Sequence, residues 1–172
     1  MDFIKEPMAI ENRSMELIAP HLEELHLDER ATKLYSRLIH ASGDVGYAPI
    51  TRVHPEAIDC AIEALKSGAH IYTDVEMVRT GINKKKLASF GGEVHCLVAD
   101  ADVAVRAKEL GITRSMVAMR QFGKALDGSI VAIGNAPTAL FEVLRMVREE
   151  GIRPACIVGI PVGFVGAAES KA

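Results

Sequence analysis

Residues 129–141 read Ser-Ile-Val-Ala-Ile-Gly-Asn-Ala-Pro-Thr-Ala-Leu-Phe, and residues 155–171 read Ala-Cys-Ile-Val-Gly-Ile-Pro-Val-Gly-Phe-Val-Gly-Ala-Ala-Glu-Ser-Lys. Each segment begins with a short run of apolar, mostly β-branched residues, which is typical of a strand buried on both faces. Between the two runs, Pro137 suits the first turn of a helix, and apolar residues recur at helical spacing as far as Val147. The two segments therefore predict a β-α-β unit with parallel strands and a right-handed crossover.

Four segments carry the strand pattern: 69–75, 93–99, 129–134 and 155–161. Helical patterns separate them, which predicts an α/β fold in three layers, with a mostly parallel sheet covered on both faces. The chain has 172 residues, so we expect a single domain over residues 1–172.

Two helices are predicted before the first strand. The first begins at Glu11 or Asn12 and continues to about Leu25. The second is capped by Asp28 and ended by Gly43.

The composition excludes several classes of protein. Lys and Arg total 20 against 23 Asp and Glu, a net charge of −3, whereas a nucleic-acid-binding surface would be basic. No segment approaches the ~20 apolar residues of a membrane span, and the N-terminus lacks a signal pattern, so we expect no membrane contact. Cys60, Cys96 and Cys156 form no C-x-x-C pair and lie in apolar patterns, which predicts core positions in a cytoplasmic protein.

Small residues dominate the loops that follow the two strands of the β-α-β unit. Gly134, Asn135 and Ala136 follow the first strand, and Gly163 and Gly166 follow the second. Such residues leave backbone accessible to a large ligand. Because ligands of open parallel sheets bind beyond the carboxyl ends of the strands, these five positions are candidate binding residues.

Further candidates flank other predicted elements. Asp74 and Met77 follow the strand at 69–75, although Asp74 has the alternative role of capping the next turn. Arg79, close by, is a charge candidate only. Arg114 begins a helix, where a positive charge opposes the helix dipole, so it either has a further role or is an ordinary surface arginine.

His40 lies near the end of the helix that Asp28 begins. A lone histidine beside an apolar stripe is more often structural than catalytic, but the carbonyl end of a helix favours the protonated imidazole of a proton donor. Arg13 and Ser14 lie near the start of the preceding predicted helix, where a serine can also cap the backbone. The structural and the catalytic interpretation of His40 both stay open.

Several chemistries lack their sequence motif. The chain has no G-x-S-x-G turn of a serine hydrolase and no Walker loop, and Gly134-Asn135-Ala136 does not match G-x-G-x-x-G. The six histidines are scattered, without a pair at metal-ligand spacing, so we expect no metal site on the protein. A shaped pocket with one proton donor fits the remaining residues.

Three motifs carry a resemblance to a known family. They are Ile-Gly-Asn-Ala-Pro-Thr-Ala-Leu-Phe at 133–141, Gly-Ile-Pro-Val-Gly-Phe-Val-Gly-Ala-Ala-Glu-Ser-Lys at 159–171 and Leu-Ile-His-Ala-Ser-Gly at 38–43. From about Ile10 to the last residue, the chain resembles the precorrin-8X methylmutases, called cobalt-precorrin-8 methylmutases in the anaerobic pathway. The resemblance implies a Rossmann-like sheet of five parallel strands in a homodimer with interfacial active sites. We therefore expect this chain, with four strands, to lack the family's C-terminal strand and helix.

The resemblance also implies an activity. Members of the family are isomerases of cobalamin (vitamin B12) biosynthesis, which move a methyl group from C11 to C12 of a corrin precursor. No cofactor is implied, because any cobalt belongs to the substrate. Two alternatives from other classes stay open: a non-catalytic corrinoid-binding protein and a Rossmann-like nucleotide-binding domain.

Roles for individual residues follow from the same resemblance. His40 would be catalytic and would donate a hydrogen bond or proton to the ring C nitrogen of the substrate. Arg114, Ser14 and the N–H groups of residues 134–136 and 162–166 would hold its peripheral carboxylates. The other residues implied to bind substrate are Arg13, Asp74 and Met77.

Overall fold

The computed structural model describes residues 3–172. Contacts within the chain divide it into two compact units, one ending at Ile58 and the other spanning Asp59–Ala172. That residues 1–172 form a single domain stays a prediction. None of the helices in the described part of the chain is long and apolar enough to cross a membrane.

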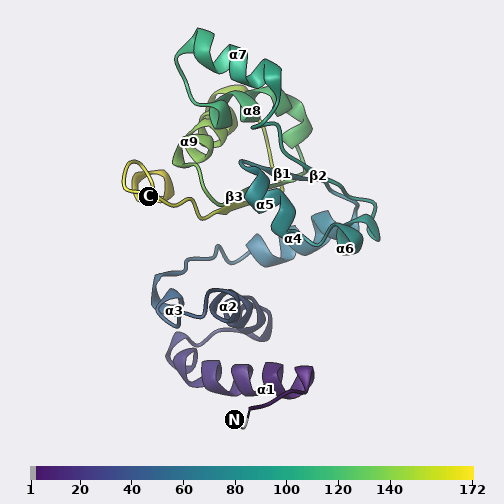
Figure 1. The fold of residues 1–172 in the computed structure, drawn as a ribbon, viewed down its shortest axis with the longest axis vertical. Coiled ribbons are helices and arrows are strands. Elements are labelled where there is room, and N and C mark those ends of the chain that lie inside the picture. Colours follow the sequence, from purple (N-terminus) through teal and green to yellow (C-terminus); the bar gives the residue numbers. More distant parts are fainter. Residues whose placement is uncertain (1–2) are drawn as a thin grey trace. The chain divides into compact units, whose positions relative to one another are not determined.

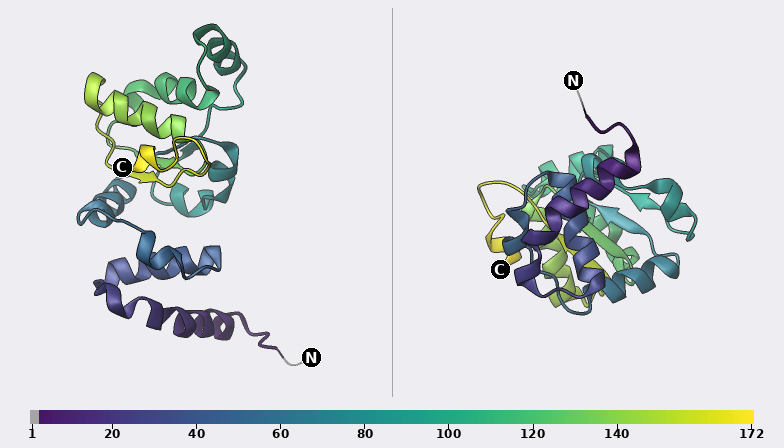
Figure 2. Two further views of the ribbon diagram at one scale, coloured as in Figure 1. Left: turned by 90° about the vertical axis from the view of Figure 1, so that its left-hand side faces the viewer. Right: turned by 90° about the horizontal axis from the view of Figure 1, so that it is seen from below.

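The first unit is helical. Its two long helices, α1 (Pro7–Ile18) and α2 (Glu29–Ser42), lie side by side (Figure 2). They are connected by 3₁₀ turns at Ala19–His21 and Glu23–Leu25, and the short helix α3 (Tyr47–Ile50) follows them. The buried core of this unit consists of Ile18, Leu22, Tyr35, Ile39 and Ala48.

The first helix begins earlier than predicted. The side chain of Glu6 accepts hydrogen bonds from the N–H groups of Met8 and Ala9, and Pro7 occupies the first turn. The predicted start at Glu11 or Asn12 was wrong because glutamate is not among the usual capping residues, so the pattern gave no signal there.

The second helix was predicted correctly at both ends. Asp28 caps α2, accepting a hydrogen bond of 2.8 Å from the N–H of Ala31. Gly43 ends the helix with a φ of 67°, a left-handed conformation that a residue with a side chain adopts only at a cost.

The second unit contains a sheet of four parallel strands (Figure 1). In chain order they are β1 (Ile71–Thr73), β2 (Val94–His95), β3 (Ile130–Ile133) and β4 (Cys156–Gly159), and their spatial order is β2-β1-β3-β4. The four predicted strands are therefore confirmed. They are shorter than predicted, and residues 96–99 form a loop because the pairing of β2 with β1 ends at His95.

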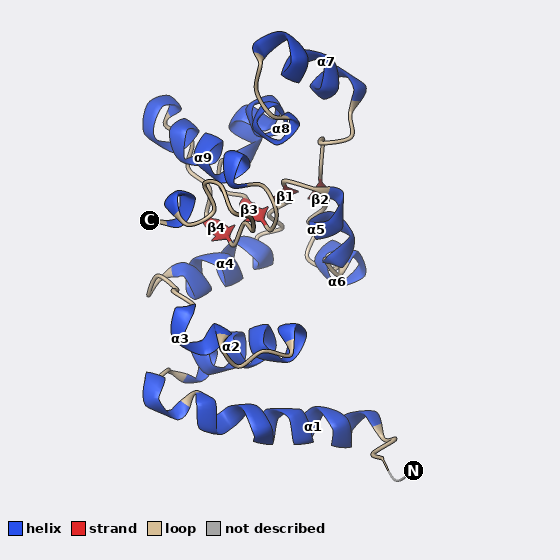
Figure 3. Ribbon diagram, turned by 60° about the vertical axis from the view of Figure 1, so that its left-hand side comes forward, coloured by secondary structure: helices blue, strands red, loops and turns tan. Residues whose placement is uncertain are grey.

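Helices cover both faces of this sheet. α8 (Arg114–Phe122) and α9 (Pro137–Arg145) lie on one face, and α4 (Ala57–Lys66) lies on the other (Figures 1 and 3). The three-layer α/β prediction is confirmed. The remaining elements are α5 (Glu76–Gly81), α6 (Lys84–Ala88), α7 (Ala101–Leu110), 3₁₀ turns at Gly123–Leu126 and Glu169–Lys171, and a π-helical turn at Met146–Glu150.

The core of the second unit lies between β3 and the helices on one face. Val131 and Ile133 have no exposed surface, as expected for an inner strand of a parallel sheet. The same cluster contains Met119 of α8 and Leu140 and Val143 of α9. Burial of these side chains fixes the position of α9, and with it the loop that precedes α9.

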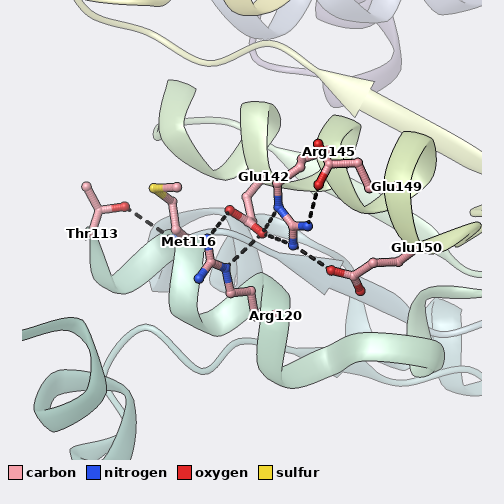
Figure 4. A network of polar contacts seen from close by, with 7 residues as sticks. All are labelled: Thr113, Met116, Arg120, Glu142, Arg145, Glu149 and Glu150. Carbon is pink, nitrogen blue, oxygen red and sulfur yellow. Dashed lines mark hydrogen bonds and ion pairs between the residues drawn. The ribbon is translucent and has the colours of Figure 1, made fainter. Parts of the chain in front are cut away.

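A buried charge joins α8 to α9. The Glu142 side chain is 1% exposed, and its carboxylate accepts hydrogen bonds from Arg120 at 2.9 and 3.0 Å and from Arg145 (Figure 4). Arg145 also binds Glu149 and Glu150. Burial alone raises the pKa of Glu142, but the hydrogen bonds from the two guanidinium groups outweigh it and hold the pKa below its ordinary value.

The cysteines are less buried than predicted. Cys60 is exposed, so its expected core position was wrong, whereas Cys96 and Cys156 are half-buried. Burial raises the pKa of the Cys96 and Cys156 thiols.

Candidate functional site

Asp74 connects the ends of two neighbouring strands. It follows β1 directly and has no exposed surface. Its carboxylate accepts hydrogen bonds from the backbone N–H groups of Gly134 at 3.1 Å, Asn135 at 2.9 Å and Ala136 at 2.6 Å. Because β1 and β3 are parallel neighbours, their carboxyl ends meet, and the loop after β3 closes over the Asp74 side chain.

This contact corrects one expectation. The N–H groups of residues 134–136 were predicted to hold substrate carboxylates, but in the structure all three donate to Asp74. The expectation named the substrate as the source of the carboxylate, and the helix dipole in front of α9 favours negative charge from any source. The carboxylate belongs to the protein itself, so Asp74 holds the loop in shape.

Close packing explains the glycine of this loop. A Cβ atom at Gly134 would lie 2.6 Å from Cγ2 of Val78 in α5, which is too close for any side chain. Pro137 then begins α9 in the first turn, as predicted. The loop therefore approaches α5 more closely than any other residue would allow.

The second Gly-rich loop lies against the first. The N–H of Val162 donates to the backbone oxygen of Asn135 at 3.3 Å. Gly163 and Gly166 have φ values of 128° and 78°, and a Cβ at Gly166 would lie 3.2 Å from the Phe141 ring. The two loops predicted as binding elements are thus brought together at the carboxyl edge of the sheet.

Apolar side chains on the second loop are open to solvent. Phe164 and Val165 are almost completely exposed, and Val162 is 59% exposed. Beyond them, the chain is held by a hydrogen bond from Lys171 Nζ to the Pro161 oxygen at 3.2 Å. The loop is held at both ends by hydrogen bonds, while the apolar side chains in its middle are exposed. This arrangement suits contact with a large flat ligand or another protein chain.

Arg114 is held near the start of α9. The hydroxyl groups of Thr113 and Thr138 are 2.9 Å apart, which joins the N-terminus of α8 to the first turn of α9. Thr113 also accepts a hydrogen bond from the Met116 N–H and so caps α8 (Figure 4). Arg114 is exposed and makes no ion pair within residues 3–172, so its guanidinium is available to an anionic ligand.

The candidates that follow β1 differ in accessibility. Met77, in α5, is 66% exposed. Arg79 donates to Glu76 in an ion pair of 2.6 Å on the same helix. Met77 can therefore contact a ligand, while the charge of Arg79 is already balanced.

The remaining candidates belong to the first unit. Arg13 is exposed and pairs with Glu16 at 2.8 Å. Ser14 lies inside α1 and donates to the Ile10 oxygen at 2.9 Å, so the alternative that it caps the helix start was wrong, because the helix begins seven residues earlier. His40 lies in the last turn of α2 with an exposed ring, which no hydrogen bond or ion pair from the described residues engages.

A groove of this unit lies elsewhere. It runs between α1 and α2 and is lined by residues that include Glu11, Met15, Ser36 and Arg37. Neither Ser14 nor His40 lines it.

One cluster was missed by the sequence reasoning. His70, Glu93 and His95 place possible ligand atoms within 4.8 Å of one another. His70 lies 23 positions before Glu93, so the spacing along the chain did not connect it with Glu93 and His95. The signal that could have found them is the alternation His70-x-Tyr72 and Glu93-x-His95 on two strands that pair in parallel.

Fold and loops together define the class of protein: a three-layer α/β protein whose Gly-rich loops meet at the carboxyl edge of a parallel sheet. The chain belongs to the precorrin-8X methylmutase family, whose sequence model matches residues 9–172.

Relatives with similar sequences carry related names. A cobalt-precorrin-8 methylmutase of Priestia megaterium is 41% identical over 166 residues, covering 96% of this chain and 74% of the relative. A precorrin-8X methylmutase of a Sinorhizobium species is 42% identical over 170 residues, covering 99% of this chain and 80% of the relative.

A solved structure shows the same fold. The precorrin-8x methyl mutase from Thermus thermophilus superposes with a TM-score of 0.85 at 36% identity, covering 95% of this chain and 79% of that one. The family resemblance of the three sequence motifs is therefore confirmed.

Proposed function

We propose that this chain is a methylmutase that acts on precorrin-8X or cobalt-precorrin-8 in cobalamin biosynthesis. Methylmutases are isomerases, and the reaction moves a methyl group from C11 to C12 of the corrin precursor. Family membership carries the proposal. The ordered pair of Gly-rich loops agrees with it, because a large flat substrate needs a shaped apolar surface more than it needs a nucleophile or a redox group.

His40 is the proton donor in this proposal. Its ring is exposed, has no partner among residues 3–172 and lies in the last turn of α2. A hydrogen bond or proton from His40 to the ring C nitrogen favours the rearranged π-system. No covalent intermediate and no cofactor are required, and any cobalt enters as part of the substrate.

Arg114 has the role of binding a peripheral carboxylate of the substrate. Its guanidinium, which forms no ion pair with the described residues 3–172, can form a charge-assisted hydrogen bond with such a group. Arg13, Ser14 and Met77 are retained as substrate contacts in the proposal.

The occupied backbone donors argue against the nucleotide-binding alternative. A phosphate group would need the N–H groups in front of α9, and Asp74 already accepts from three of them. The Asp74 carboxylate would also repel a phosphate.

The proposal includes a cytoplasmic homodimer. Within the described residues β4 pairs only with β3, so one edge of β4 is open, and Val162, Phe164 and Val165 expose apolar surface nearby in the sequence. Open strand edges and exposed apolar groups favour association with a second chain. The three cysteines are free thiols, which suits a reducing compartment.

Turnover is tested by mixing the purified protein with precorrin-8X and with cobalt-precorrin-8 in turn and following the visible spectrum. Conversion of either substrate supports the proposal and identifies the natural one. His40→Ala should abolish conversion while product affinity stays within about tenfold, or 1.4 kcal/mol. His21→Ala, which removes another exposed histidine of the first unit, is the matched control and should retain activity.

Two results would count against the assignment. Full activity of His40→Ala would remove His40 from the mechanism. Tight corrinoid binding by the unaltered protein without conversion of either substrate would favour the non-catalytic binding protein.

A further inference from the structure

Parallel pairing of β1 and β2 places four polar or aromatic side chains on one face of the sheet. Ile71 pairs with Val94 and Tyr72 with His95, and the N–H of Ile71 donates to the Glu93 oxygen at 2.8 Å. In this register His70 lies opposite Glu93. Because alternate residues of a strand share a face, His70 and Tyr72 project to the same side as Glu93 and His95.

The two histidine rings are in direct contact. Nδ1 of His70 lies 2.8 Å from Nε2 of His95, and the same His95 nitrogen lies 4.0 Å from Oε2 of Glu93. Two imidazole nitrogens at 2.8 Å need a proton or a cation between them, since two lone pairs facing one another repel.

Neighbouring side chains hold the histidine cluster in place. The His95 ring stacks on Tyr72 with centroids 5.0 Å apart, and Tyr72 packs edge-on against Phe122 at 4.7 Å. Thr73 donates from its hydroxyl to the backbone oxygen of His95 at 3.0 Å. The histidines are therefore oriented by packed neighbours, as the ligands of a metal site are.

The donor set matches a particular class of ion. Two imidazole nitrogens with one carboxylate oxygen suit borderline divalent metals such as Zn²⁺, Co²⁺ and Ni²⁺, whereas Mg²⁺ prefers oxygen ligands. Nitrogens bound to one tetrahedral ion are about 3.3 Å apart, so the two nitrogens would have to separate by about 0.5 Å and the stacked rings would have to turn until both lone pairs face the ion. The Glu93 side chain is 72% exposed and free to turn toward the ion.

We propose that His70, Glu93 and His95 form a binding site for one divalent transition-metal ion, with water completing the coordination. The ion would cross-link β1 to β2, an edge strand of only two residues. This site is separate from the candidate substrate residues, because His70 precedes β1 while Asp74 follows it, about 13 Å away along an extended strand. The inference does not rest on the proposed function.

Metal titration of the full chain tests this site. Protein freed of metal with a chelator is titrated with Zn²⁺ in competition with a chromophoric chelator. We expect one ion per chain with a Kd below about 10 µM, and no displacement by millimolar Mg²⁺. Zn²⁺ should also raise the melting temperature, because the folded chain, which brings the three ligands together, binds it more tightly than the unfolded chain does.

Substitutions locate the ion. His70→Gln and His95→Gln should each weaken Zn²⁺ binding at least about tenfold, and Glu93→Gln should weaken it less. His54→Gln and Cys60→Ser, which alter exposed potential ligands elsewhere, should leave the affinity within about twofold. Since Glu93 is exposed, its variant should fold even if a histidine variant does not, and the visible absorption of bound Co²⁺ then reports the change of ligand.

Two outcomes would overturn the proposal. One is the absence of Zn²⁺ binding tighter than about 1 mM. The other is equal affinity in the unaltered protein, Glu93→Gln and whichever of the two histidine variants folds, which would assign the ion to other residues.

Discussion

Asp74 shows how one side chain can set the shape of a loop. It is the acceptor for three successive backbone N–H groups that would otherwise face the end of β1 without a partner. A buried donor without an acceptor is costly, so this carboxylate matters for stability before any ligand arrives.

Asp74→Asn should lower the free energy of unfolding by about 3 kcal/mol, because the amide keeps one acceptor oxygen but turns its NH₂ group toward a donor. Urea denaturation measures the change. Asp102→Asn, at an exposed aspartate of α7, is the control and should stay within about 0.5 kcal/mol. Equal effects of the two substitutions would remove the loop-holding role.

Arg114→Ala should weaken substrate affinity by about 1.5–3 kcal/mol, because a charge-assisted hydrogen bond to a carboxylate is lost. The maximal rate should change less, since that carboxylate is remote from ring C. Titration followed by single-turnover kinetics separates the two effects. Arg106→Ala removes an exposed arginine of α7 instead, and a similar loss of affinity there would point to a general charge effect.

For single residues, the sequence predicted where functional residues lie along the chain better than it predicted which residues they contact. It led us to expect small residues at 134–136 and a carboxylate supplied by the substrate in front of them. It could not show that Asp74, sixty positions earlier, supplies the charge, because only the pairing of β1 with β3 brings the two together. The cluster of His70 with His95 was missed for the same reason.

Among the elements, α8 and α9 depend on the charge of Glu142. Both arginines that bind it keep part of their side chains in water, 39% for Arg120 and 31% for Arg145. If the Glu142 carboxylate is removed, water can partly solvate the two arginines that it leaves behind. The loss of folding free energy is therefore smaller than for breaking a fully buried ion pair.

Glu142→Gln should lower the free energy of unfolding by about 2 kcal/mol at about pH 7. The pKa of Glu142 is depressed in the folded chain, so its contribution is present above the ordinary value of 4.5 and is lost as pH falls through the folded pKa. The difference between the variant and the unaltered protein should therefore shrink as urea titrations are carried out at pH values progressively below 4.5.

Glu149→Gln provides the matched control. Glu149 also pairs with Arg145 but its side chain is 59% exposed, so its loss should cost less than about 1 kcal/mol. If Glu142→Gln lowered the free energy of unfolding by the same amount at neutral and at acid pH, the stabilisation could not come from the ionised carboxylate of Glu142.

Element boundaries were predictable where local chemistry decides them. Asp28 and Gly43 delimit α2, and Asp100 and Gly111 delimit α7, because capping needs only nearby backbone. The length of β2 was not predictable, since a parallel strand ends where its neighbour stops pairing. The π-helical turn after α9 had no signal in the apolar periodicity.

For the whole molecule, we expect light scattering at about 10 µM to give twice the chain mass of 18.6 kDa, because β4 has an open edge beside exposed apolar residues. Phe164→Asp, at a fully exposed position, should weaken self-association if the second Gly-rich loop takes part. A monomeric mass for the unaltered chain would contradict the homodimer.

The strand order β2-β1-β3-β4 has a consequence for synthesis on the ribosome. Ile71 of β1 must pair with Ile130 of β3, which is translated 59 positions later, or about 3–12 s at ordinary elongation rates. During that interval the nascent chain can pair β1 with β2 only, so one edge of β1 and the carboxylate of Asp74 face water. The centre of the sheet is completed late, and chaperones that shield open strand edges would act on this chain in that interval.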